Sequence, residues 1–215
     1  MSKYNAVIWD LDGTLLDTLQ DLMNSVNYSM RELGYAECTM EQIRMFVGNG
    51  VKKLVELAIP DGSANPDYPR AYEIFCEHYA EHNLDNTRPY DGVVEVINEL
   101  RAHGIKQAIV SNKVDDGVRK LNDAFFGVDV ALGVTDDLPR KPAPDMVYRA
   151  MSLLGADEDE TVYIGDSEVD MRTAANSGLP CISVLWGFRS REELLEFNPK
   201  CMVSKPSEII KELEL

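Results

Sequence analysis

The chain has 215 residues, a formal net charge of −16 and a hydrophobic fraction of 45%, the balance of a folded protein with a real core. Acidic residues outnumber basic ones by 37 to 21, so we expect no nucleic-acid partner and no anionic membrane surface as partner. The apolar runs are too short to cross a bilayer and no signal peptide is recognisable, which favours a cytoplasmic protein.

The first 90 residues predict one strand followed only by helices. Residues 6–9 form an apolar run that ends at Asp10, which predicts a buried strand. Apolar residues then recur at helical spacing, and Gly34 ends the first of these stripes. No convincing strand is predicted before Arg88. The predicted helices cover residues 17–33, 40–47, 51–59 and 68–84.

From Asp91 onward, predicted strands and helices alternate. This order predicts a parallel, doubly wound sheet that is covered by helices on both faces. The helical stretch before it is far longer than an ordinary crossover, so we expect it to be an inserted domain. The predicted fold is an α/β core of residues 1–16 and 88–215 with an all-helical domain of residues 17–87. The core strands are predicted at 105–110, 128–134, 161–164, 180–186 and 202–203, and its helices at 93–103, 114–126, 144–154, 169–177 and 207–213.

Polar side chains stand after four of the predicted core strands. In an open parallel sheet, ligands bind beyond the carboxyl ends of the strands, so these side chains are expected to share one rim. Each of them alone has an ordinary explanation as a helix cap or a surface lysine. The groups, in chain order, are Asp10-Leu11-Asp12-Gly13-Thr14, Ser111-Asn112-Lys113, Lys141, and Gly165-Asp166 with Asp170 one helical turn later.

Asp10 and Asp12 predict a cation at this rim. Two carboxylates so close repel each other unless a cation joins them. Carboxylate oxygens suit Mg²⁺ better than zinc. Magnesium and Lys141 together would leave a positive hole for an anion, with the hydroxyls of Thr14 and Ser111 as donors. The pattern therefore indicates a phosphate site with an aspartate in line to attack phosphorus.

These motifs resemble those of the haloacid dehalogenase superfamily in its large phosphatase branch, and the likeness covers essentially the whole chain. The runs at residues 15–18, 89–92 and 141–145 are similar to its phosphoglycolate phosphatases. The resemblance implies a Rossmann-like core with a helical cap. It also implies a Mg²⁺-dependent phosphomonoester hydrolase of small phosphorylated metabolites that acts through an aspartyl-phosphate.

The same resemblance implies a role for each matching residue. Asp10 is the nucleophile, and Asp12 protonates the leaving oxygen and then activates water. Mg²⁺ is held by the Asp10 carboxylate, the Asp12 carbonyl and Asp166, with Asp170 supporting that shell. The phosphoryl oxygens are held by Thr14, Ser111, Asn112 and Lys141. Because an alkoxide leaving group needs a proton, an acid at Asp12 favours phosphate esters over carbon–halogen bonds.

Two segments of the helical stretch carry further candidates. The glycine-containing loop at residues 47–53 predicts substrate contacts from Asn49, Lys52 or Lys53, although a plain turn with solvated lysines explains it equally well. His78 and His82 match the H-x-x-E-H pattern of some zinc peptidases, but no third ligand is evident.

The motifs leave several activities open. A sugar phosphomutase such as β-phosphoglucomutase, a pyrophosphatase or a nucleotidase would share them. A signalling module that keeps its phosphoaspartate is a remote alternative. The sequence names neither the substrate nor the oligomeric state, and a monomer and a homodimer both remain open.

Overall fold

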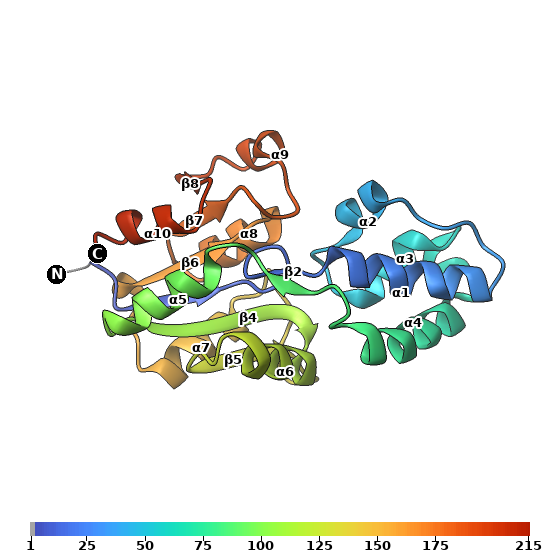
Figure 1. Ribbon diagram of the computed structural model, residues 1–215, viewed down its shortest axis with the longest axis horizontal. Coiled ribbons are helices and arrows are strands. Elements are labelled where there is room, and N and C mark those ends of the chain that lie inside the picture. Colours follow the sequence, from blue (N-terminus) through green and yellow to red (C-terminus); the bar gives the residue numbers. More distant parts are fainter. Residues whose placement is uncertain (1–2) are drawn as a thin grey trace. The chain divides into compact units, whose positions relative to one another are not determined.

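The computed structural model describes residues 3–215 and divides the chain into two compact units (Figure 1). One unit contains the chain up to Leu16 together with Pro89–Leu215, and the other is Asp17–Arg88. Residues 1 and 2, which the sequence analysis assigns to the core, lie outside the described part. The helical unit is therefore inserted directly after the first strand and its loop.

Within the described residues, the first unit is built on a six-stranded parallel sheet of order β5-β4-β1-β6-β7-β8. The first strand of the chain, β1, lies at the centre, between β4 and β6 (Figure 1). The predicted parallel, doubly wound fold is confirmed. The strands are β1 (Ala6–Trp9), β4 (Lys106–Val114), β5 (Val130–Val134), β6 (Thr161–Gly165), β7 (Cys181–Val184) and β8 (Cys201–Val203).

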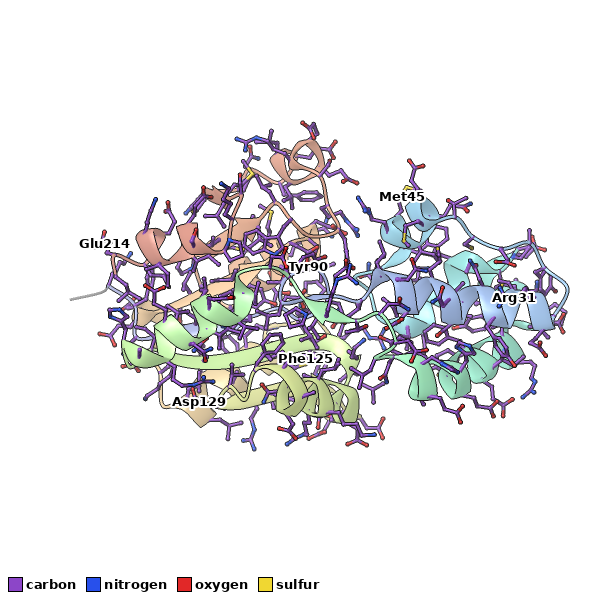
Figure 2. The ribbon with its side chains drawn as sticks, viewed as in Figure 1. Arg31, Met45, Tyr90, Phe125, Asp129 and Glu214 are labelled. Carbon is purple, nitrogen blue, oxygen red and sulfur yellow. The ribbon has the colours of Figure 1, made fainter. Side chains whose placement is uncertain are left out.

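Both faces of this sheet are buried. Side chains alternate along β1, so Val7 and Trp9 enter one core while Ala6 and Ile8 enter the other. Residues of α5 (Val93–Ala102), α6 (Asp115–Phe125) and α10 (Ser207–Glu212) line the first core, at whose margin lie Tyr90 and Phe125 (Figure 2). Residues of α7 (Asp145–Leu154) and α8 (Glu168–Asn176) line the second. Double burial explains why the strands read as continuous apolar runs.

The inserted unit is helical, as predicted. Its helices are α1 (Leu19–Glu32), α2 (Met40–Phe46), α3 (Val51–Ala58) and α4 (Tyr68–His82), with a 3₁₀ turn η1 (Gly62–Ala64). α1 packs against α4 through the apolar stripe that includes Leu22, Val26 and Met30. Thr39 and Gln42 form a capping box that begins α2. No helix within residues 3–215 combines the length and the apolar character needed to span a bilayer.

Three features differ from the sequence prediction. β4 continues to Val114, past the predicted end at 110, through an irregularity in its pairing with β5. The short strands β2 (Leu16–Asp17) and β3 (Arg88–Pro89) pair with each other where the chain leaves and re-enters the first unit. They are too short for any periodicity to reveal. The helix α9 (Arg191–Leu195) and the 3₁₀ turn η2 (Glu158–Glu160) are also additional.

Candidate active site

Asp10 and Lys141 form the centre of the candidate site. Asp10 follows β1, and its backbone N–H donates to the Ile164 carbonyl of β6 at 2.9 Å. The Lys141 Nζ lies 2.6 Å from Asp10 Oδ1 and 2.7 Å from Asp170 Oδ1, and it also donates to the Tyr163 hydroxyl. All four side chains are buried. The ammonium group therefore bridges two carboxylates that come from different strand ends.

The charges in this cluster shift one another's pKa values. Burial, followed by the negative charge of Asp170, raises the pKa of Asp10 well above its usual value. Burial alone would lower the pKa of Lys141, but Asp10 and Asp170 outweigh it and the pKa is raised, so this lysine stays charged. Burial and Asp170 raise the pKa of Asp166 to about 7. The positive charge of Lys141 thus does not offset the burial and mutual repulsion of the three carboxylates.

The same three aspartates can hold a cation. Asp10, Asp166 and Asp170 each offer one carboxylate oxygen, and these oxygens lie within 4.8 Å of one another. We call these residues the carboxylate cluster. A hard divalent ion prefers such oxygen donors, and its charge would offset the burial and the repulsion that raise the pKa values of Asp10 and Asp166. The donor set therefore fits a divalent metal ion.

Gly13 and Thr14 bring the first motif against Asp166. Gly13 has a φ of +93°, and a Cβ atom there would lie 2.5 Å from Asp166 Oδ2, so only glycine fits. The Thr14 hydroxyl is fully buried, 3.2 Å from Asp166 Oδ1 and 3.5 Å from Asp10 Oδ2. Thr14 therefore links the β1 end to the β6 end.

Asp12 lies beside Lys113, at the edge of this cluster. The two side chains form an ion pair with 3.2 Å between Lys113 Nζ and Asp12 Oδ1, and Lys113 is 7% exposed. Within residues 3–215 this buried oxygen has no hydrogen-bond partner. Asp12 Oδ1 is thus held by charge while its hydrogen-bonding capacity is unused.

The amide of Asn112 holds the backbone of Lys141. Asn112 Oδ1 accepts from the Lys141 N–H at 2.7 Å, and its Nδ2 donates to the Lys141 carbonyl at 3.2 Å. The neighbouring Ser111 hydroxyl is buried and accepts from the Lys113 N–H. The Asn112 side chain thus positions the backbone of Lys141, and its contact with phosphate stays a prediction.

Comparison with known proteins places this geometry in a family. The model of the family described as "Haloacid dehalogenase-like hydrolase" matches residues 7–184. The chain belongs to this family. A phosphoglycolate phosphatase from Thiobacillus denitrificans is 32% identical over 210 residues, covering 94% of this chain and 92% of that protein. One from Aquifex aeolicus is 28% identical and covers 95% and 94%.

A solved structure supports the same placement. A protein from Lactobacillus delbrueckii subsp. bulgaricus, for which phosphoglycolate phosphatase activity has been proposed, superposes with a TM-score of 0.93. It is 35% identical, and the match covers 98% of both chains. The haloacid dehalogenase-like assignment therefore covers the inserted helical unit as well as the core.

Some of the predicted residues of this haloacid dehalogenase-like hydrolase belong to the helical unit. Lys53 pairs with Glu56 at 2.8 Å, and the Lys52 ammonium lies 5.8 Å from the centre of the Tyr72 ring. Asn49 lies in the loop before α3. His78 contacts the Ser25 hydroxyl, and among the described residues it joins no group of three metal-ligand side chains.

Two residues of the site were given no role by the sequence prediction. Tyr163 lies within the apolar run of β6, where an aromatic residue reads as core, yet its hydroxyl contacts both Lys141 and Asp170. Lys113 follows the second motif, but its burial depends on β4 continuing past residue 110. A lysine inside an otherwise buried strand is the signal that could have identified it.

Proposed function

We propose that this chain is a Mg²⁺-dependent phosphomonoesterase of small phosphorylated metabolites, most like phosphoglycolate phosphatase, that forms an aspartyl-phosphate on Asp10. The observation that carries the proposal is the buried contact of Lys141 with Asp10 and Asp170, beside Asp166. A buried carboxylate next to a charged lysine and a cation site suits attack on a phosphate, whose negative charge these cations would balance. The named relatives support the substrate class.

The first step belongs to Asp10 and Asp12. Lys141 holds Asp10 Oδ1, while Oδ2 has one hydrogen-bond contact among residues 3–215, the long 3.5 Å one with Thr14, so Oδ2 is the freer oxygen. Asp10 attacks phosphorus and the bond to the leaving oxygen breaks. Asp12, which must enter this step protonated, gives that oxygen its proton and is left as a carboxylate.

The second step reverses the role of Asp12. Asp12 takes a proton from water, the water oxygen bonds to phosphorus, and the bond to Asp10 breaks. Inorganic phosphate and the free Asp10 carboxylate result. Asp10, the Asp12 carbonyl and Asp166, with Asp170 in support, would hold Mg²⁺, which would supply positive charge to the phosphoryl oxygens. Thr14, Ser111 and Lys141 donate to these oxygens, and Asn112 keeps Lys141 in place.

The helical unit is proposed to act as the cap that selects the leaving group. Asn49, Lys52 and Lys53 remain its candidate substrate contacts. A cap that excludes water protects the aspartyl-phosphate from untimely hydrolysis.

The test measures inorganic phosphate release with Mg²⁺ from 2-phosphoglycolate, sugar phosphates, nucleotides and pyrophosphate. We expect a clear preference for 2-phosphoglycolate, and loss of activity in Asp10→Asn by at least about 10³-fold, because covalent catalysis ends. Asp145→Asn, which changes an aspartate outside the cluster, is the matched control and should keep its activity. Equal turnover of the whole panel would contradict the substrate assignment, and unchanged activity of Asp10→Asn would contradict the mechanism.

A further inference from the structure

The segment of residues 186–189, between β7 and α9, touches the carboxylate cluster although none of the four sequence motifs includes it. It reads Trp186-Gly187-Phe188-Arg189, and each of its residues makes a distinct contact with the site or its support. All of these contacts lie inside the first unit.

The backbone of this segment fixes one oxygen of Asp166. The Phe188 N–H donates to Asp166 Oδ2 at 2.7 Å, and both residues are buried. Thr14 donates to the other oxygen, Oδ1, at 3.2 Å. Because a backbone N–H cannot rotate away as a side chain can, Asp166 Oδ2 stays hydrogen-bonded to the Phe188 N–H. Oδ1 is then the oxygen that contacts the Thr14 hydroxyl.

Gly187 permits this close approach. A Cβ atom at position 187 would lie 2.3 Å from both Asp166 Cβ and the Gly13 carbonyl oxygen. Any other residue would push the segment away from Asp166. The close packing also joins the segment to the first motif.

The two ends of the segment are anchored by side chains. The Trp186 indole N–H donates to the Thr14 carbonyl at 3.0 Å. The Arg189 Nε pairs with Glu168 Oε2 at 2.9 Å, with only 10% and 20% of the two side chains exposed. Glu168 begins α8, the helix that carries Asp170. The segment is therefore bonded at one end to Thr14 and at the other end to the start of α8.

We infer that residues 186–189 are a positioning element for the metal ligand Asp166, with Trp186 and Arg189 as its anchors. The segment holds Asp166 in one orientation, with Oδ2 bonded to the Phe188 N–H and Oδ1 bonded to the Thr14 hydroxyl. Loss of either anchor lets the Phe188 N–H drift and frees Asp166 to turn. The inference rests on the proposed metal site and assigns to it residues outside the four motifs.

The test measures Mn²⁺ binding by electron paramagnetic resonance of the free ion, so that it does not depend on catalysis. Trp186→Phe removes the indole donor but keeps an aromatic ring, and Arg189→Met removes the charge but keeps the chain length. We expect each variant to bind Mn²⁺ about 10- to 100-fold more weakly, the usual effect of losing a partner of a metal ligand. When the metal is saturating, the kcat of each variant should lie closer to the wild-type value than its metal affinity does.

Two control variants make the same changes elsewhere. Trp9→Phe removes an indole donor whose acceptor is Gln107, and Arg119→Met removes a surface partner of Asp115. Both should bind Mn²⁺ as the wild type does. Gly187→Ala, if it folds, should show the largest loss, because its Cβ atom meets Asp166 directly.

The inference is overturned if Trp186→Phe and Arg189→Met both fold and bind Mn²⁺ like the wild type, or if the wild type binds none. Phosphate release is scored separately. A wild type that binds Mn²⁺ and loses it in the variants, yet releases no phosphate from any ester, contradicts the proposed function while supporting the positioning role.

Discussion

Lys113 is the residue that ties Asp12 to the candidate site. Its ammonium lies 3.2 Å from a carboxylate oxygen that lacks an aligned hydrogen-bond donor. This ion pair keeps the Asp12 carboxyl group close to Lys113. It leaves the lone pairs of Asp12 Oδ1 able to accept a proton. This arrangement suits a group that must hand a proton to a leaving oxygen and then take one from water.

Replacing Lys113 by methionine should therefore affect proton transfer more than binding. We expect kcat/KM for 2-phosphoglycolate to fall on the order of 10²-fold, the typical cost of a misplaced catalytic group. The loss for p-nitrophenyl phosphate should be much smaller, since its leaving group needs no proton. Lys106→Met, at the opposite end of β4, is the control and should change neither value. Equal losses on both esters would contradict the role given to Lys113.

At this scale the sequence predicted which motifs meet but not every residue that completes the site. Parallel strands present their carboxyl ends at one rim, and the order of strand ends therefore predicted which side chains meet there. The structure brings these side chains together: Asp10, Lys141, Asp166 and Asp170. The pairing of the Asn112 amide with the backbone of Lys141 was not predicted, because it depends on how the loop before Lys141 folds.

Among the elements, α1 is tied to the end of the helical unit by a single buried carboxylate. Asp21 accepts hydrogen bonds from the backbone N–H groups of Asn86 and Thr87, and from both of their side chains. Burial raises its pKa, but these donors outweigh burial and the pKa is lowered. The charged form of Asp21 thus joins the first helix to the segment that leads into β3.

Asp21→Asn should destabilise the protein by about 3 kcal/mol, because an amide cannot accept all of these bonds and brings unmatched donors. Since the folded pKa lies below the unfolded value of about 3.9, the carboxylate stabilises the fold fully above that pH. The difference between wild type and variant should shrink as the pH falls below about 4. Urea unfolding at several pH values measures it.

Asp85→Asn provides the comparison, since Asp85 belongs to an exposed pair with His82 in the same unit. It should change stability by less than about 1 kcal/mol. A pH-independent difference between Asp21→Asn and the wild type would contradict the assignment of a charged, hydrogen-bonded Asp21.

The elements that the sequence predicted are those with a strong apolar pattern. The buried strands and the amphipathic helices follow directly from that pattern. β2 and β3 were missed because two residues carry no periodicity, and α9 because five residues show little of it. The Ser190–Glu193 capping box is the local signal that could have predicted α9.

At the scale of the whole molecule, charge poses the central problem. A chain with a net charge of −16 must bind a phosphate, which is itself an anion. The carboxylate cluster adds further negative charge beside Lys141, and burial together with the charge of Asp170 raises the pKa values of Asp10 and Asp166. Positive charge must therefore be gathered locally, by Lys141 and by a divalent ion at the cluster. We expect Asp10 to react with phosphate only when the Lys141 ammonium and the divalent ion are both present.

The most direct test of this account is to trap the phosphorylated protein. Wild-type protein mixed with Mg²⁺ and 2-phosphoglycolate is quenched within milliseconds and treated with borohydride, which reduces an acyl phosphate to an alcohol. Mass spectrometry of the peptides then locates the modified residue. We expect reduction at Asp10 with Mg²⁺, and none when a chelator replaces the metal. Rapid phosphate release with Asp10 unmodified, or a label on another residue, would contradict covalent catalysis by Asp10.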